Sequence, residues 1–159
     1  MELVHSIIIR ALVAKKVSHG CTNENYNADL TKNRSMSDLI YKDESYAIIG
    51  KCFEVHNNLG PGFLEIVYKD ALEYEFRKAN IPFEREKEYI VNYKEIHLKH
   101  KFYADFVVYD KIILEAKAVS FIADEFVARA INYLKVSENK LALIVNFGEL
   151  KLNYKRIVY

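Results

Sequence analysis

The sequence predicts an α/β domain in which a mixed central sheet is flanked by helices. Apolar residues recur at helical spacing over residues 43–79, alternate with polar residues from 89 onward, and return to helical spacing over 124–137. A chain of 159 residues with 51% hydrophobic residues is long and apolar enough for one domain with a substantial core.

Two helices are expected at the start of this domain. Apolar residues share one helical face over residues 43–59, and the Gly-Pro-Gly segment at 60–62 ends that helix. The second helix is expected over 63–79, and Pro82 prevents it from continuing.

Strands and a third helix are expected after Pro82. Residues 124–137 have helical spacing, and the remaining apolar segments are short or alternate with a period of two. The expected strands are 89–93, 96–109 with a bend near Tyr103 and Ala104, 112–118, 141–147 and 154–159.

The domain is expected to occupy residues 36–159. Residues 1–35 are interpreted as an N-terminal extension, either poorly ordered or a marginal helix, and Met36 is one candidate for the start of the functional unit. The net charge of +1 excludes a polycation, so any nucleic-acid affinity must come from a local patch. Two cysteines without paired spacing, and no apolar run long enough to span a bilayer, indicate a cytoplasmic protein that does not enter a membrane.

A carboxylate and an ammonium group lie inside the apolar run 112–119. Their burial is costly unless they pair with each other or with a metal ion. Glu115 and Lys117 are two residues apart, so they leave the same face of a strand, and Asp105 lies on the preceding strand. Two hard oxygen ligands beside a lysine suit Mg²⁺-dependent hydrolysis. An ordinary surface strand with an ion pair is the alternative interpretation.

The register of the two strands decides whether Asp105 joins this group. A two-residue loop at Asp110 and Lys111 would place Asp105 opposite Ala116, on the wrong face. An odd-length turn or a bulge would place it opposite Lys117 instead. The metal-site hypothesis therefore requires an odd-length turn, a bulge or a bend.

Glu65 is a further candidate for the site. It borders the apolar stripe of the second helix, in the first turn, where the electropositive helix terminus favours a carboxylate. A simple helix-capping role is the alternative.

A basic stretch follows the first expected strand. It could contact backbone phosphates, or it could keep a solvated strand edge charged against aggregation. Its members are Lys94, His97, Lys99, His100 and Lys101.

Residues 59–68 resemble the signature of the GxxExxY protein family, through Gly62, Glu65 and Tyr68. Further segments match the family in order and spacing, and together they cover nearly everything from residue 43 onward. These segments are Ile81-Pro-Phe-Glu84, Tyr103-Ala-Asp105, Glu115-Ala-Lys117, Asn132-Tyr-Leu134 and Asn146-Phe-Gly148.

The resemblance implies membership of the PD-(D/E)XK nuclease-like superfamily, with its restriction-endonuclease-like core. It implies that Asp105, Glu115 and the main-chain carbonyl of Ala116 are metal ligands, with Lys117 as the catalytic lysine and Glu65 completing the site. Where relatives often carry Gln before the Asn-Tyr-Leu segment, this chain has Arg129, which could bind a phosphate through two hydrogen bonds or compete with the metal.

The expected function is Mg²⁺- or Mn²⁺-dependent hydrolysis of phosphodiester bonds in a nucleic acid, and DNA is the expected substrate. The alternative is an inactive protein that keeps the nuclease scaffold and acts through a protein or nucleic-acid partner. The oligomeric state is open, and a homodimer is one option.

Overall fold

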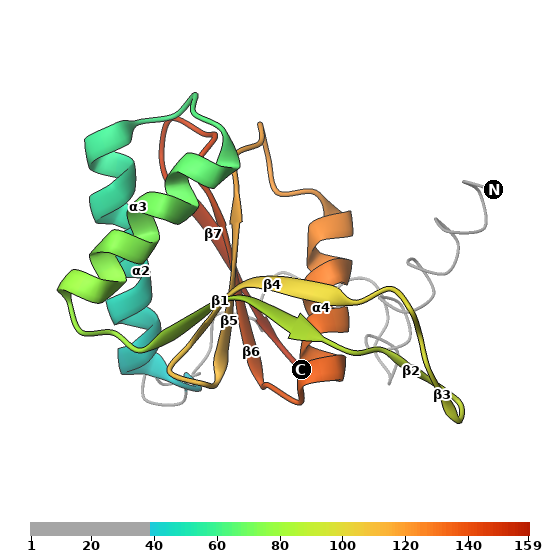
Figure 1. The fold of residues 1–159 in the computed structure, drawn as a ribbon. Helices are drawn as coiled ribbons and strands as arrows, with labels where there is room; N and C mark the ends of the chain where they lie inside the picture. The colour runs from blue at the N-terminus through green and yellow to red at the C-terminus, as the bar shows by residue number, and fades with distance from the viewer. Residues whose placement is uncertain (1–38) are drawn as a thin grey trace, which may run out of the picture. The chain divides into compact units, whose positions relative to one another are not determined.

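The computed structural model describes residues 39–159 (Figure 1). The predictions for residues 1–35 and for a start at Met36 therefore lie outside the described residues. Its helices are α2 (Lys42–Leu59), α3 (Glu65–Lys78) and α4 (Asp124–Ser137). Its strands are β1 (Phe83–Tyr89), β2 (Asn92–Tyr93), β3 (Ile96–His97), β4 (Phe102–Val108), β5 (Ile112–Lys117), β6 (Leu141–Asn146) and β7 (Asn153–Val158).

The main sheet has five strands in the order β1-β4-β5-β6-β7. The β5–β6 pair is parallel and the other three pairs are antiparallel, so the predicted mixed sheet is confirmed. Helices α2 and α3 cover one face of this sheet and α4 covers the other (Figure 1). Strands β2 and β3 form a separate two-stranded sheet.

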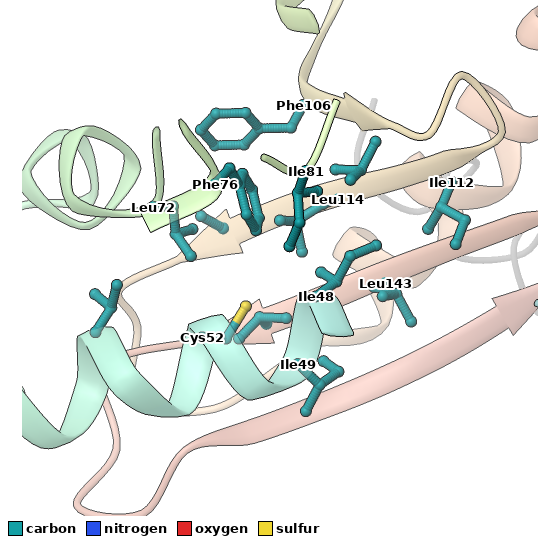
Figure 2. Close-up of a cluster of buried hydrophobic side chains, with 14 of the residues drawn as sticks. Ile48, Ile49, Cys52, Leu72, Phe76, Ile81, Phe106, Ile112, Leu114 and Leu143 are labelled. Atoms are coloured by element: carbon teal, nitrogen blue, oxygen red, sulfur yellow. The ribbon is translucent and has the colours of Figure 1, made fainter. Parts of the chain in front are cut away.

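The larger core lies between the sheet and the α2–α3 pair. Figure 2 shows Ile48 and Cys52 of α2 packed with Phe76 of α3 and with Leu114 and Leu143 of the central strands. All five side chains are fully buried. Because β5 and β6 also pack against α4 through their alternate residues, every residue of both strands is buried.

The second helix starts two residues later than predicted, at Glu65. The two residues before it are held outside the helix because the Phe63 amide donates a hydrogen bond to the Tyr68 hydroxyl over 3.2 Å. The same hydroxyl donates to the Gly60 carbonyl over 2.8 Å. Tyr68 therefore fixes the loop between α2 and α3 and makes Glu65 the first helical residue.

The prediction of one long strand over 96–109 was wrong. The structure has β3 and β4 there, separated by residues 98–101, which are all exposed. Apolar alternation continues through this stretch, but among residues 39–159 no neighbouring strand pairs with it, so the sheet does not extend there. Within β4, Ala104 packs towards α4 while Phe106 packs towards α2 and α3, so the strand changes phase around Asp105.

Candidate active site

The ammonium group of Lys117, at the end of β5, is surrounded by oxygen atoms. Its Nζ donates to the main-chain oxygen of Ala116 over 2.6 Å and lies 3.4 Å from Oε2 of Glu115. It is also 3.5 Å from Oδ2 of Asp105 and 3.6 Å from Oε1 of Glu65. The structure thus brings together all four of the predicted catalytic residues and the predicted ligand carbonyl.

The connection between β4 and β5 has the odd length that the site requires. Phe106 pairs with Leu114 and Val108 with Ile112, which leaves residues 109–111 as a three-residue turn. Two consecutive turn residues, Tyr109 and Asp110, have φ of 56°, a left-handed conformation. Continued by one step, this register sets Asp105 beside Glu115, so the expectation that it would lie opposite Lys117 was wrong.

Main-chain pairing between β4 and β5 stops at Phe106 and Leu114, just before the site. Beyond that point, main-chain amides of the two strands donate hydrogen bonds to carboxylate side chains. The Ala116 amide donates to Oδ2 of Asp105 over 2.9 Å, and the Asp105 amide donates to Oε1 of Glu115 over 3.4 Å. The separation of the two strands therefore gives both carboxylates fixed positions between them.

Helix α3 supplies two charged groups to the cluster. Glu65 is its first residue and its side chain is 37% exposed, so it lies at the rim. One turn later, Lys69 Nζ lies 3.1 Å from Oδ1 of Asp105, with only 14% of its side chain exposed. Sequence analysis missed Lys69, although its spacing of four residues from Glu65 places both on one face of the helix.

The electrostatics of the site favour a proton on Glu115. Burial of its carboxyl group and the negative charge of Asp105 raise the pKa of Glu115 from 4.5 to about 7, against the opposing effect of Lys117. Burial lowers the pKa of Lys69, but the hydrogen bond to Asp105 and the combined attraction of Asp105, Glu65 and Glu86 outweigh it, so the net shift is upward. Lys69 and Lys117 thus provide positive charge for carboxylates that would be costly to bury alone.

Asn146 holds the loops behind the site together, and it is fully buried. Its Oδ1 accepts hydrogen bonds from the amides of Val119 and Gly148, over 3.0 and 3.1 Å. Its Nδ2 donates to the Val119 carbonyl and to Oε1 of Glu149, both over 2.8 Å. The chain leaving β5 after Lys117 is therefore tied to the chain leaving β6.

Two neighbours of Asn146 strengthen the same connection. The Phe147 amide donates to the Lys117 carbonyl over 2.7 Å, and the Phe147 ring stacks on Tyr68 at 4.7 Å between centroids. A Cβ atom at Gly148 would lie 2.4 Å from the Val119 oxygen, so only glycine fits there. The Asn146-Phe-Gly148 segment and Tyr68 therefore have structural roles that sequence analysis did not assign.

Arg129 is not part of the cluster in the described structure. It lies on the exposed side of α4, one turn before Tyr133, and no hydrogen bond or ion pair joins it to the site among residues 39–159. Burial and the charges of Glu115 and Asp105 raise the pKa of Tyr133, whereas Arg129 lowers it. Arg129 and the carboxylates of the site thus have opposite electrostatic effects on the pKa of the Tyr133 hydroxyl.

The oxygen atoms of the cluster are possible ligands for a divalent ion. Within residues 39–159, no group of three or more His, Cys, Asp and Glu side chains is arranged to hold a metal. However, carboxylate oxygens of Asp105 and Glu115 and the Ala116 carbonyl lie 2.6–3.5 Å from one point, the Nζ of Lys117. This point is taken by the ammonium group, but hard oxygen atoms are the ligands that Mg²⁺ prefers, so the residue types fit such an ion chemically.

Comparison with known proteins identifies the family. No helix among residues 39–159 has the length and apolar character needed to cross a membrane. Searches of the curated proteins and of the solved structures gave no match. A family model of the PD-(D/E)XK nuclease superfamily matches residues 42–157, which include every helix and nearly all of the sheet described above. A five-stranded mixed sheet flanked by helices fits the restriction-endonuclease-like α/β fold of that group, and the chain belongs to the PD-(D/E)XK nuclease superfamily.

Proposed function

We propose that the protein is a metal-dependent nuclease that hydrolyses phosphodiester bonds of DNA. The observation that carries this proposal is the convergence of Asp105, Glu115 and the Ala116 carbonyl around the Lys117 ammonium, at the point where β4 and β5 separate. Superfamily membership supports a nuclease, and the arrangement of these groups supports metal-assisted hydrolysis.

In this proposal Asp105, Glu115 and the Ala116 carbonyl hold Mg²⁺ or Mn²⁺. When bound, the ion polarises the phosphate and lowers the pKa of a water molecule. Lys117 orients the attacking water and stabilises negative charge on the phosphate. Glu65, 3.6 Å from Lys117 Nζ, orients that ammonium group or helps to hold a second ion.

Arg129 is proposed to contact a phosphate of the bound strand. Its exposed position on α4 leaves its guanidinium group accessible to a ligand outside the cluster. A planar guanidinium can donate two parallel hydrogen bonds to one phosphate. This role is separate from the hydrolytic step.

The match to the GxxExxY motif is structurally coherent, and we assign the chain to that family as part of the proposal. Tyr68 fixes the loop at Gly60 and Phe63, and this contact sets the start of the helix that carries Glu65. The proposed location is the cytoplasm, because the buried thiol of Cys52 and the lack of paired cysteine spacing suit a reducing compartment.

The second candidate function is a nuclease-fold protein that binds partners without cleaving them. It is favoured by the ion pairs of the cluster, in which Lys69 and Lys117 already neutralise carboxylates of the site. A thermal-shift titration separates the two candidates. An ion that binds only the folded state raises its apparent stability, so no shift with millimolar Mg²⁺ or Mn²⁺ would favour the inactive protein.

Cleavage assays test the main proposal directly. Purified protein is incubated with Mg²⁺ or Mn²⁺ on single- and double-stranded DNA, alongside the variants Lys117→Ala and Glu115→Gln. Both variants are expected to lose cleavage by about 100-fold or more, as is typical when a catalytic group is removed. Lys140→Ala, which changes an exposed lysine before β6, serves as the matched control. Equal cleavage by all proteins would indicate a contaminant or another site.

A further inference from the structure

Residues 90–101 form an arm that extends beyond the main sheet. In Figure 1 the β2–β3 hairpin projects past the ends of β1 and β4, away from the helices. Asn92 pairs with His97 and Tyr93 with Ile96, and the Leu98 amide donates to the Val91 carbonyl over 2.8 Å. Every residue from 92 to 101 is exposed.

The arm gains little stability from the rest of the domain. A two-stranded hairpin alone is at best marginally stable in water. This one has only two residue pairs, yet it exposes Tyr93 and Ile96 by 57% and 58%. Exposed apolar side chains beside unsupported strands are a cost in the isolated protein, and a bound partner would offset it.

The charge of the arm is complementary to a polyanion. Within residues 90–101 the chain has three lysines and two histidines but only one acid, Glu95, whereas the whole chain has a net charge of +1. Lys101, at the base, is neutralised by Glu88 at 2.6 Å. Lys94 and Lys99 have no ion pair among the described residues, and Lys94 lies over the Tyr93 ring at 5.5 Å.

The arm is joined to the candidate active site through β4. Asp105 is the fourth residue of that strand, six residues after Lys99 and eleven after Lys94. At about 3.3 Å per extended residue, Lys99 lies at most about 20 Å from Asp105. The hairpin turns back at Lys94 and Glu95, so Lys94 is about as far from Asp105 as Ile96 is. Ile96 is nine residues before Asp105, so this distance is at most about 30 Å.

We propose that this arm binds the phosphate backbone of a DNA duplex, at most about six base pairs (Lys99) and nine base pairs (Lys94) from the bond that the candidate site cleaves. The interval is the span of the arm divided by the rise of about 3.4 Å per base pair. The inference deepens the proposed nuclease function and rests on it. Lys94 and Lys99 supply the charge, and the exposed Tyr93 and Ile96 pack against the sugar edge of the backbone.

Binding measurements with two lengths of DNA test the arm. Fluorescence anisotropy is recorded in EDTA, to prevent cleavage, with a 24-base-pair duplex and with a hairpin that has a four-base-pair stem. Lys94→Gln/Lys99→Gln is compared with wild type and with Lys78→Gln/Lys140→Gln. The control pair removes equal charge from exposed lysines at the end of α3 and before β6.

The arm variant is expected to bind the long duplex more weakly, with a salt-dependence slope reduced by about two, one for each lost phosphate contact. The short stem and the control variant should behave as wild type does. An unchanged slope on the long duplex, equal loss on both lengths, or no binding of DNA by wild type would overturn the proposal. The last result would point to a protein partner.

Hydrolysis of bis(p-nitrophenyl) phosphate with Mn²⁺ separates this proposal from the nuclease function. This small phosphodiester reaches the candidate site but is too short to contact the arm. The arm variant should hydrolyse it at the wild-type rate. If wild type does not hydrolyse it while the length-dependent binding is present, the cleavage function fails and the arm's role in DNA binding stands.

Discussion

The raised pKa of Glu115 predicts a specific dependence of stability on pH. The pKa is 4.5 in the unfolded chain and about 7 in the folded protein, so the folded state holds this proton more tightly. The resulting stabilisation is fully present below about pH 4.5 and is lost as the pH rises through 7. This rise in the pKa of Glu115 corresponds to about 3 kcal/mol of stabilisation, most of which is lost between pH 5 and pH 8.

Glu115→Gln is the perturbation that isolates this effect. The amide has nearly the same shape as the protonated acid but does not titrate, and titrating groups outside the cluster contribute alike to both proteins. Urea unfolding at four pH values from 5 to 8, in EDTA, gives the free energy of unfolding of each. Wild type should lose about 2–3 kcal/mol relative to the variant across this range. Parallel curves for the two proteins would refute the assignment of a buried, proton-binding carboxyl group to Glu115.

Three further predictions concern the same cluster and its support. Asn146→Ala removes both hydrogen-bonding groups of a fully buried side chain. It should lower the free energy of unfolding by about 2–4 kcal/mol in urea titrations. The control Asn57→Ala, on the exposed side of α2, should change this free energy by less than about 0.5 kcal/mol. Mn²⁺ affinity measured by calorimetry should fall by up to about tenfold per pH unit below pH 7, because the ion needs ionised Glu115, and a flat profile would contradict this. Lys69→Met removes a positive charge 3.1 Å from Asp105 and should tighten Mn²⁺ binding by about fivefold or more in the same assay. Lys69→Arg keeps the charge, so its Mn²⁺ affinity should stay near that of wild type.

The helices could be predicted from local pattern, but the edges of the sheet could not. Apolar spacing located α2 to within one residue, because that helix buries a continuous face. The same kind of pattern merged β3 with β4, since alternation does not reveal whether a partner strand lies alongside. The start of α3 was also missed, because it depends on the contact of Tyr68 with Phe63 and Gly60.

The charged residues of β5 were conspicuous in sequence because they interrupt an apolar strand. Asp105 was placed correctly on the neighbouring strand, but its partner depended on a turn whose left-handed residues, Tyr109 and Asp110, carry no glycine to mark them. Lys69 could not be distinguished from a surface lysine, since the residue that it pairs with is 36 positions away. Register and long-range ion pairs are thus the parts of the site that required coordinates.

The two lysines change the electrostatic argument for a metal. From sequence alone, the buried charges at Glu115 and Lys117 required pairing with each other or with a metal ion. In the structure, Lys69 and Lys117 lie beside them, and with the Glu115 proton held to about pH 7 the cluster is close to neutral without any ion. A divalent ion that enters this cluster must displace that proton or be accompanied by negative charge. The phosphate of a substrate brings such charge, so in the proposed mechanism the metal and the nucleic acid favour each other's binding.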